Sequence, residues 1–422
     1  MAIIIAMVAA GALYAAGARD AGGAQAETGR PSLRIFVPFD TRYIGEEYVD
    51  NLFKACEMLD YDCDIEQDAE GYRTQILVEM TARQLPDVFF TWGDSYSEPF
   101  LEAGVLLPIT EALRASDNRY YPSYVIPWRD GEIYTAPYTP NDHFVVYYNK
   151  EIFAQAGVEP PETFEEFMEV VRTIQAEVPD VFPIGLGGQN RVQGDLLYNM
   201  MVLREDPEAF ARAISGEGSF TDRPFVAAAE RLKEIVDARP FQLGFIQASQ
   251  PEIQQMMWDG RVAMFPMGSW VFPNAIRNLG DNLGYFPFPQ LRPDPNFRMK
   301  STSMFGDQPN GLIVSRTTRF PEAATELVLL YSRLMNEDMA RQGRMTFMET
   351  TVTPEQPLHP AYAAYVADAS QLTFLQPFWY GVIDPSIGEE MRDLNQEFFL
   401  GSMTPQEFTR QLQSIMQRAV QN

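Results

Sequence analysis

The sequence predicts an α/β fold in two domains, each built on a mostly parallel β-sheet flanked by helices. Short runs of β-branched and aromatic residues alternate with amphipathic helical patterns from residue 33 onward, and this order is typical of a sheet that is covered by helices. The chain has 422 residues, of which 46% are hydrophobic. A chain of this size buries more than one core and usually divides into two domains.

Residues 1–26 have the pattern of a signal-like leader. An apolar run from Ala2 to Ala16 is followed by small and polar residues, and the run is shorter than a comfortable membrane span. Ala16-Gly17-Ala18 or Ala24-Gln25-Ala26 suits a signal peptidase. No Lys or Arg precedes the run, so a buried helix stays open as the alternative. We expect export and an extracytoplasmic location.

The first region after the leader alternates strand and helix patterns. In sheets of this kind ligands bind beyond the carboxyl ends of the strands, because the crossover connections are right-handed. We therefore expect the loops 40–43 and 92–95 at one edge of the first sheet. The expected strands are 33–39, 62–67 and 87–92, and the expected helices are Glu46–Leu59 and Tyr72–Arg83.

A second region begins near Tyr138 with a strand and a well-marked helix. Thr163 and Glu166 have the spacing of a capping box at the start of this helix. Its apolar residues recur at helical spacing and predict a buried stripe of Phe164, Phe167, Val170, Val171 and Ile174. Later helices are expected at 192–203, 224–238, 251–258, 321–335, 337–345, 389–400 and 404–420.

The two cysteines, Cys56 and Cys63, are seven residues apart. In an oxidising compartment they can form a disulfide, and closing so short a loop stabilises a fold by about 2.5 kcal/mol in the chain-entropy model. Two partly buried free thiols are the equally weighted alternative.

Charge and motif content exclude several function classes. The net charge is −26 and the pI is about 4.4, so the folded protein repels nucleic acid and anionic lipid. His143 and His359 have no His or Cys partner at ligand spacing, and the chain has no GxSxG, CxxC or GK[ST] motif. The run 185–190 fits a plain turn better than a phosphate loop. We expect no cofactor, no metal and no nucleic-acid partner.

Aromatic residues make up 13% of the chain, and several lie in loops beside short polar residues. The three relevant segments are Trp92-Gly93-Asp94-Ser95, Gly268-Ser269-Trp270 and Phe378-Trp379-Tyr380. The C–H faces of a sugar stack on flat rings, whereas its hydroxyl groups need several directional hydrogen-bond partners. The pattern therefore favours a carbohydrate site, and ordinary core packing of each single ring stays open.

Ordered stretches over nearly all of the chain after the leader resemble one known family. They are PDVFFTW with LEAGVLLPIT, PYTPNDHFVVYYNKEIFAQAGVEPPETFEEF, DGRVAMFPMGSW, LGYFPFPQL, NGLIVSRTTRFPEAATELVLLYS and the late FWY. This order is similar to that of the extracellular solute-binding proteins of ABC importers, which include maltose-binding protein.

The resemblance implies the type II periplasmic-binding-protein fold, in which two lobes close around a ligand. The first lobe would comprise 32–138 plus 286–336, and the second 139–285 plus 337–422. The chain would cross between them near Ala136–Thr139 and Tyr285–Phe288. It also implies a monomer that delivers a mono- or oligosaccharide to the membrane permease subunits of the importer.

Site residues are carried over from the resemblance position by position. Trp92 matches a first-lobe ring, Trp270 and Trp379 match second-lobe rings, and Asp142 aligns with an acidic acceptor of sugar hydroxyls. Further ligand contacts are expected at Asp40, Arg42, Asp94, Ser95, Asn190, Tyr198, Gly306 and Tyr380.

Two alternatives to a sugar-binding protein stay open. One is a binding protein for a non-sugar solute. A polyol phosphate would require Arg42 or Arg191 in the cleft, and a cationic osmolyte would require aromatic rings near Asp94 or Asp142. The other is a glycoside hydrolase, which needs two carboxyl groups beside the scissile bond. Asp142 with Glu132 is the nearest candidate for such a pair. The favoured prediction is a binding protein and no enzyme.

Overall fold

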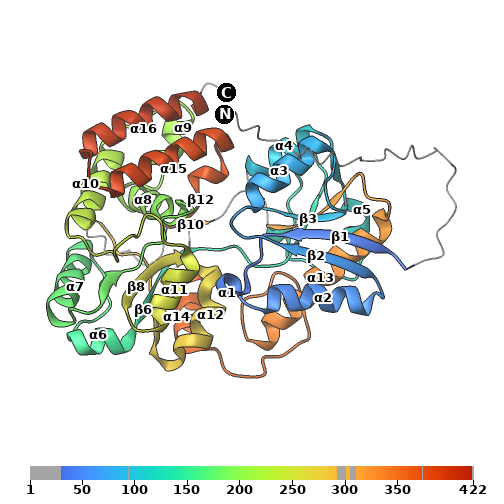
Figure 1. Cartoon of the computed structure of the whole chain (residues 1–422), viewed down its shortest axis with the longest axis horizontal. Coiled ribbons are helices and arrows are strands. Elements are labelled where there is room, and N and C mark those ends of the chain that lie inside the picture. Colours follow the sequence, from blue (N-terminus) through green and yellow to red (C-terminus); the bar gives the residue numbers. More distant parts are fainter. Residues whose placement is uncertain are drawn as a thin grey trace, which may run out of the picture. The chain divides into compact units, whose positions relative to one another are not determined.

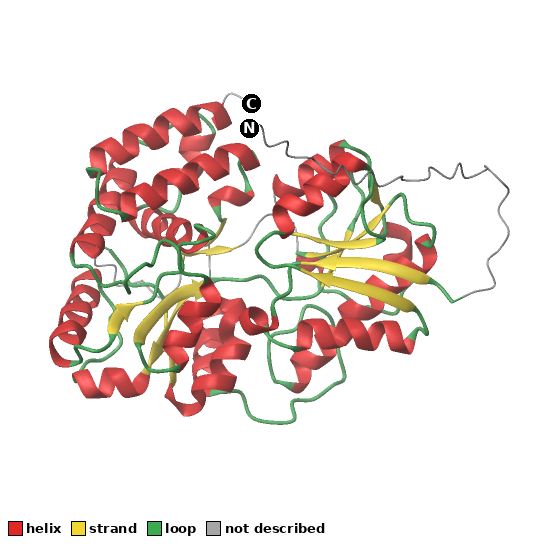
Figure 2. Cartoon of the chain, viewed as in Figure 1, coloured by secondary structure: helices red, strands yellow, loops and turns green. Residues whose placement is uncertain are grey.

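The fold is built on two main β-sheets with separate hydrophobic cores (Figure 1). The structure, a computed structural model, describes residues 30–93, 95–128, 130–291, 301–304, 310–372 and 374–420. Helices cover both sheets (Figure 2), so the predicted two-lobed α/β class is confirmed. The expected leader, residues 1–26, lies outside the described residues.

The first sheet has the strand order β2-β1-β3-β11-β4, and β5 also pairs with β11. Strand β1 runs parallel to β2 and β3, whereas β11 runs antiparallel to β3, β4 and β5. Their bounds are β1 Ser32–Val37, β2 Asp62–Gln67, β3 Val88–Thr91, β4 Leu106–Leu107, β5 Thr135–Pro137 and β11 Gly311–Ser315.

The second sheet has the order β7-β8-β6-β9. Strand β6 is antiparallel to β8 and β9, and β7 is parallel to β8. A separate parallel pair joins β10 to β12. The bounds are β6 Phe144–Asn149, β7 Phe182–Ile184, β8 Val262–Gly268, β9 Leu283–Phe286, β10 Ser301–Met304 and β12 Phe374–Pro377.

Both main sheets are therefore mixed rather than mostly parallel. The antiparallel strands β6 and β11 each come first after the chain has passed from one core to the other. A strand that enters a sheet from the other lobe is not tied to its neighbours by a βαβ crossover, and only that crossover makes consecutive strands parallel. The alternation of strand and helix patterns in the sequence indicates the βαβ crossovers within one lobe. It does not indicate where the chain crosses from one lobe to the other.

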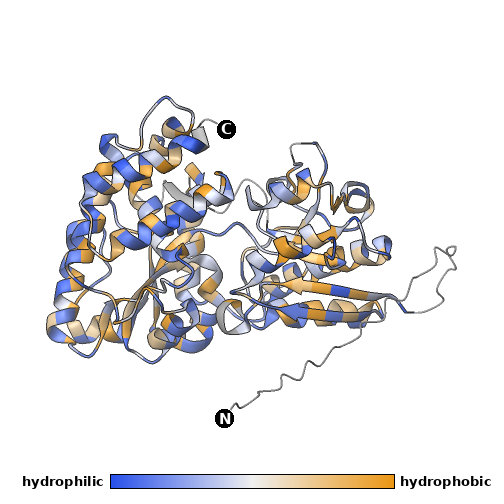
Figure 3. Cartoon of the chain, turned by 45° about the horizontal axis from the view of Figure 1, so that its top comes forward, coloured by the Kyte–Doolittle hydropathy of each residue, from blue (hydrophilic) through white to orange (hydrophobic). Residues whose placement is uncertain are grey.

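Helices α2 and α13 pack together on one face of the first sheet, and α3 and α4 lie on the other side (Figure 1). The strands are largely hydrophobic, and the surrounding helices carry hydrophilic stretches (Figure 3). The helices of this lobe are α1 Thr41–Ile44, α2 Glu47–Met58, α3 Tyr72–Ala82, α4 Glu98–Glu102, α5 Thr110–Ala115 and α13 Pro321–Arg341.

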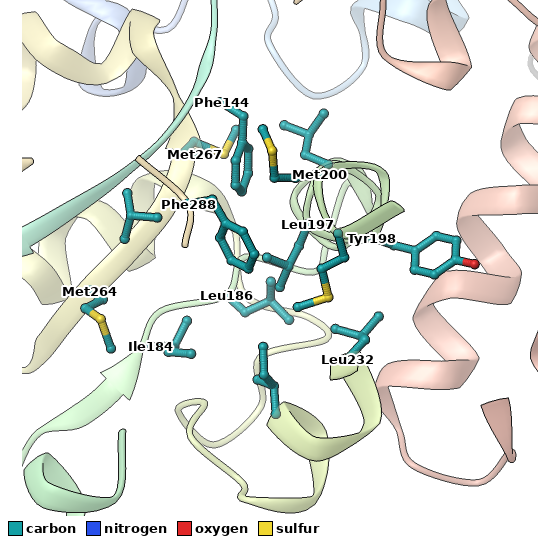
Figure 4. Packing of buried hydrophobic residues seen from close by; sticks show 14 of the residues in the cluster. Phe144, Ile184, Leu186, Leu197, Tyr198, Met200, Leu232, Met264, Met267 and Phe288 are labelled. Carbon is teal, nitrogen blue, oxygen red and sulfur yellow. The ribbon is translucent and has the colours of Figure 1, made fainter. Parts of the chain in front are cut away.

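Among the described residues, the second lobe has more helices and the larger core, part of which is shown in Figure 4. Met200 of α8 lies near Met267 of β8 and Phe144 of β6 in this core. Its helices are α6 Lys150–Ala156, α7 Phe164–Glu177, α8 Val192–Glu205, α9 Ala209–Ile214, α10 Arg223–Asp237, α11 Gln250–Trp258, α12 Phe272–Leu279, α14 Pro360–Ala369, α15 Pro385–Phe399 and α16 Pro405–Val420.

The start of α7 confirms the predicted capping box. The Thr163 side chain accepts a hydrogen bond from the Glu166 amide, and the Glu166 side chain accepts one from the Thr163 amide. All five residues of the predicted stripe are buried. Local hydrogen bonding and the apolar stripe thus specify the same helix.

One long helix, α13, replaces the two helices expected at 321–335 and 337–345. It continues through Asn336 and ends at Arg341. The buried Asn336 side chain accepts hydrogen bonds from the amides of Phe347 and Met348. These long-range contacts order the segment after the helix without a helical turn.

The two cores divide the chain at different places from those expected. The chain leaves the first core after Tyr138 and enters the second at Phe144. Residues 286–291 were expected in the first lobe, but Phe286, Phe288 and Leu291 pack in the second core. Conversely, Met339 of α13 and Phe347 and Met348 after it pack in the first core, although residues 337–422 were expected in the second lobe. The chain therefore returns to the first core after β10, which contacts α8 and β6 of the second lobe, and it leaves that core after Met348.

Cys56 on α2 and Cys63 on β2 form a disulfide, and this finding decides between the two alternatives. Their Cα atoms are 6.3 Å apart, within the usual range for a disulfide. The bond connects the end of a helix to the edge strand of the first sheet.

Removing this disulfide should destabilise the first lobe by about 2.5 kcal/mol, because the unfolded chain regains the entropy of a short loop. Urea unfolding of the oxidised protein, with and without a reducing agent, measures this loss. The Cys56→Ala/Cys63→Ala variant is the control, since its midpoint should not respond to reductant. Equal midpoints for oxidised and reduced wild type would contradict the prediction.

Candidate functional site

A cavity of about 380 Å³ is lined by residues from both cores. Its size lies within the range of small-molecule sites. From the first lobe it is lined by Pro38, Phe39, Ile44, Tyr48, Ala69, Glu70, Arg73, Thr74, Phe90, Trp92, Tyr138 and Asn310. Beyond Tyr138 it is lined by Thr139, Asp142, Gln189, Asn190, Arg191, Val192, Gln250, Trp270, Tyr380, Glu389 and Arg392.

Four rings of the first lobe form an aromatic wall of the cavity. Phe39 and Phe90 come from the ends of β1 and β3, Tyr138 follows β5, and Tyr48 lies on α2. Contacting rings among them have centroids 5.7 to 5.9 Å apart, the spacing of edge and tilted aromatic contacts. These rings were not among the predicted site residues, although their position near strand ends is the signal that marks them.

Trp92 follows β3 and lies at the edge of this wall. Its ring meets the edge of Phe90 at 4.8 Å and that of Tyr96 at 5.6 Å. The Arg73 guanidinium lies over the Trp92 ring, with Cζ 3.8 Å from the centroid. One face of the indole is therefore covered by a cation from the first turn of α3.

The Trp270 ring reaches the cavity because residue 268 has no side chain. A Cβ atom built on Gly268 would lie 1.6 Å from the Trp270 ring, so the indole lies directly against the end of β8. Any larger residue at this position would displace the ring. The predicted segment Gly268-Ser269-Trp270 thus works as a unit.

Asp142 approaches the same segment from the chain between the two cores. The Ser269 hydroxyl donates to Asp142 Oδ1 at 2.8 Å, and the His143 amide donates to the Ser269 hydroxyl at 3.1 Å. The serine therefore fixes the direction of the carboxyl group.

Burial raises the pKa of Asp142 to about 7, although the Ser269 hydrogen bond and the Arg344 charge oppose this shift. Burial lowers the pKa of His143 to about 4, so this imidazole is neutral near pH 7. Its Nδ1 is 2.9 Å from the Tyr365 hydroxyl. Asp142 is thus the member of this pair that changes charge near neutral pH.

The opposite rim carries polar groups of the second lobe. Asn190 Oδ1 accepts from the Val192 amide at 3.2 Å and from the Gln250 side chain at 3.4 Å. Arg191 pairs with Glu389 at 2.5 Å and also with Asp393. An anionic ligand would have to compete with two carboxylates for this guanidinium.

Arg392 lies behind the Tyr380 ring. Its Cζ is 5.3 Å from the ring centroid, and it pairs with Glu389. Tyr380 therefore presents one ring of the second lobe to the cavity with a neutralised cation beneath it.

Five of the predicted site residues line the cavity together: Trp92, Asp142, Asn190, Trp270 and Tyr380. They come from segments far apart in the sequence, and the tertiary structure brings them to one place. Sequence reasoning missed Glu70, Arg73 and Thr74. These residues follow the carboxyl end of β2. Ligands of α/β sheets bind beyond the carboxyl ends of the strands, and applying this rule to β2 as well as to β1 and β3 would have predicted them.

Tyr198 and Trp379 lie elsewhere, in the core of the second lobe. Both have 0% exposure, and the Tyr198 hydroxyl donates to the Phe225 carbonyl. Trp379 stacks on Phe210 with centroids 4.7 Å apart. These two rings pack as core residues, so they are left out of the proposed site.

The remaining predicted residues take other positions. Asp40 precedes α1 and accepts the Ile44 amide with its carbonyl oxygen; it is not in the cavity lining. The Ser95 hydroxyl donates to the Tyr380 carbonyl at 3.1 Å and so links the two lobes. Arg42 lies in α1, but its side chain is outside the described part, as are Asp94 and Gly306.

The candidate hydrolase pair is not assembled in the cavity. Glu132 accepts a hydrogen bond from Thr110 in the first lobe and is not a lining residue. Asp142 therefore does not have this partner beside it, as glycoside hydrolysis would require. Among the described helices, none has both the length and the apolar composition for crossing a bilayer.

Known proteins with similar sequences are solute-binding proteins. The melibiose/raffinose/stachyose-binding protein MelE of Bacillus subtilis is 22% identical over 230 residues, which are 53% of this chain and 52% of MelE. The diacetylchitobiose binding protein DasA of Streptomyces coelicolor is 30% identical over 224 residues, 52% of this chain and 51% of DasA. This chain spans about half the length of the curated relatives it matches.

Solved structures with the same fold cover almost the whole chain. A chitin oligosaccharide binding protein superposes with a TM-score of 0.80 at 21% identity, over 93% of this chain and 100% of that one. The bacterial solute receptor AcbH gives 0.78 at 16% identity, over 92% and 99%. At these identities the likeness shows the fold.

The family model described as bacterial extracellular solute-binding protein matches residues 59–330, which is more than half of the chain. The match begins in the first lobe, spans the whole first stretch of the second and ends within α13. This protein belongs to the family of bacterial extracellular solute-binding proteins.

Proposed function

We propose that this protein is the extracytoplasmic substrate-binding component of an ABC importer and that it binds a carbohydrate between its lobes. The observation that carries the proposal is the shared cavity, where Trp92 of the first lobe and Trp270 and Tyr380 of the second meet. The relatives named above are binding proteins for oligosaccharides, and their family is extracellular. Delivery to membrane permease subunits belongs to the same proposal.

The chemistry of the cavity suits a saccharide. Its rings offer flat apolar faces for C–H groups, and Asp142, Asn190 and Gln250 offer directional oxygen and nitrogen atoms for hydroxyl groups. Reversible binding needs nothing more than these contacts, and the chain contributes them from both lobes. We therefore propose binding without bond cleavage.

The contacts between the lobes are suited to opening and closing. Ser95 donates to the Tyr380 carbonyl at 3.1 Å, and Asn274 donates to the Thr41 carbonyl at 3.4 Å. These are single neutral hydrogen bonds, each worth about 1 kcal/mol. The half-exposed Arg277 of α12 also pairs with Glu47 of α2 at 3.5 Å, and an ion pair of this kind adds little to the stability of the contact. A ligand that touches both lobes can therefore shift the equilibrium toward the closed form.

Titration with saccharides should raise the melting temperature and change the tryptophan fluorescence, because Trp92 and Trp270 line the cavity. Ligand at a hundred times its Kd stabilises the native state by about 2.7 kcal/mol. Thermal unfolding against a panel of mono- and oligosaccharides measures the effect. If no sugar shifts either signal while a polyol phosphate or a quaternary amine does, the ligand is not a carbohydrate.

Gly268→Ala should weaken saccharide binding by about tenfold or more, because a Cβ atom displaces the Trp270 ring. Isothermal titration with the best ligand gives the affinity. Gly218→Ala is the matched control, since residue 218 is outside the cavity lining and a Cβ atom there meets no backbone atom closer than 3.5 Å. Equal affinities of both variants would remove Trp270 from the site.

Saccharide affinity should rise about tenfold between pH 6 and pH 8. A sugar hydroxyl that donates to Asp142 favours the carboxylate, and burial holds the pKa of the free carboxyl at about 7, so the ligand must displace a proton below that pH. Asp142→Asn should bind with no such rise. Asp195 also has a pKa of about 7 because of burial, but it lies in the second-lobe core and is unchanged in this comparison. An equal pH response of both proteins would contradict a contact to Asp142.

A further inference from the structure

Arg73 differs from the other cations of the cavity. Three arginines with described side chains line it: Arg73, Arg191 and Arg392. Arg191 and Arg392 form ion pairs with carboxylates of α15. No carboxylate of the described residues pairs with Arg73, and its charge faces the cavity from the first turn of α3. Glu70 also lines the cavity, and its side chain is exposed.

The position of Arg73 is fixed by its neighbours. Tyr72 beside it is fully buried, and its hydroxyl donates to the Phe90 carbonyl at 2.5 Å and accepts from the Phe90 amide at 2.9 Å. The Tyr96 hydroxyl donates to the Arg73 carbonyl. These bonds attach the start of α3 to the end of β3, so the Arg73 backbone is held at the edge of the first sheet.

The side chain is held by aromatic faces. The guanidinium Cζ is 3.8 Å from the Trp92 centroid and 4.8 Å from the Tyr96 centroid. Cation–π contact orients the group but leaves its full charge and the N–H groups at its edge for another partner. Trp92 therefore acts as a support for Arg73 on this face rather than as a stacking surface for a sugar.

The net charge of the chain bears on what the cation Arg73, which forms no ion pair with a described residue, indicates about the ligand. The net charge is −26, so the electrostatic field of the whole protein repels anions. An anionic ligand therefore needs a local cation to bind. Two of the three cavity arginines are neutralised from within the same lobe. A third that is preorganised and not neutralised is the arrangement that an anionic ligand group needs.

We propose that Arg73 binds a carboxylate of the ligand, and that the saccharide therefore contains a uronic acid unit next to Trp92. This inference rests on the proposed function and narrows its substrate class. A single cation matches one negative charge, which a uronate carries, whereas a phosphate monoester carries about −1.5 to −2 at neutral pH. The planar guanidinium also suits a carboxylate, which it can bind through two parallel hydrogen bonds.

The test uses matched ligands and the full protein. Uronate-containing di- and trisaccharides are compared with the same compounds after reduction of each carboxylate to a primary alcohol. Calorimetric titration should give an affinity for the best acidic compound about ten- to a hundredfold above that of its reduced form, the size expected for a charge-assisted bidentate contact.

Variants of Arg73 separate charge from packing. Arg73→Gln should lose most of this preference and bind the acidic and reduced compounds with similar, low affinity. Arg73→Lys should keep part of it, because it keeps the charge but not the planar fork. Arg114→Gln is the charge-matched control, since Arg114 is exposed on α5 and outside the cavity lining; it should bind like wild type. Melting temperatures of all variants verify that they fold.

Each outcome bears on the inference in a defined way. A preference of wild type for the acidic compounds that Arg73→Gln abolishes supports it. Equal affinity of wild type for acidic and reduced compounds overturns it but leaves the proposed carbohydrate binding intact, as does a preference that Arg73→Gln leaves unchanged. A protein that binds no saccharide of either kind loses both the proposed function and this inference.

Discussion

The structure depends on the separate closure of two hydrophobic cores. Each sheet is covered by its own helices, and the first core ends at Tyr138 just before the second begins at Phe144. Apolar burial, the main driving force of folding, is therefore complete within each lobe. The surfaces that face each other across the cavity contribute little to it, so they are available for a ligand and can separate without unfolding either lobe.

Functional side chains reach the cavity because strands end at its edge. The segments after β1, β2 and β3 approach it from the first lobe, and the segment after β8 approaches it from the second. Small groups then set the details: the missing side chain of Gly268 lets Trp270 lie flat, and Ser269 aims the Asp142 carboxyl. The cavity thus combines rings held by sheet ends with polar groups held by short hydrogen bonds.

Charge is distributed so that the cavity differs from the rest of the surface. Arg191 and Arg392 are held by carboxylates of α15, and Glu47 lies between Arg344 and Arg277 where the lobes meet. Burial raises the pKa of Glu47, so this cluster resembles other partly desolvated ion pairs whose net contribution to stability is small. Such pairs fix geometry between the lobes more than they add affinity between them.

The sequence by itself determined the class of fold, most elements within each lobe and the family. Capping signals and apolar stripes, as in Thr163 and Phe167, act over a few residues and can be read locally. Aromatic residues beside short polar residues indicated Trp92, Trp270 and Tyr380, and the family resemblance supplied Asp142 and Asn190. Only the tertiary structure decided the mixed sheets, the core places of Tyr198 and Trp379, and the meeting of Arg73 with Trp92. Strand direction after a passage between lobes, the burial of a ring and the distance between two loops depend on residues far away in the chain, and no local pattern contains that information.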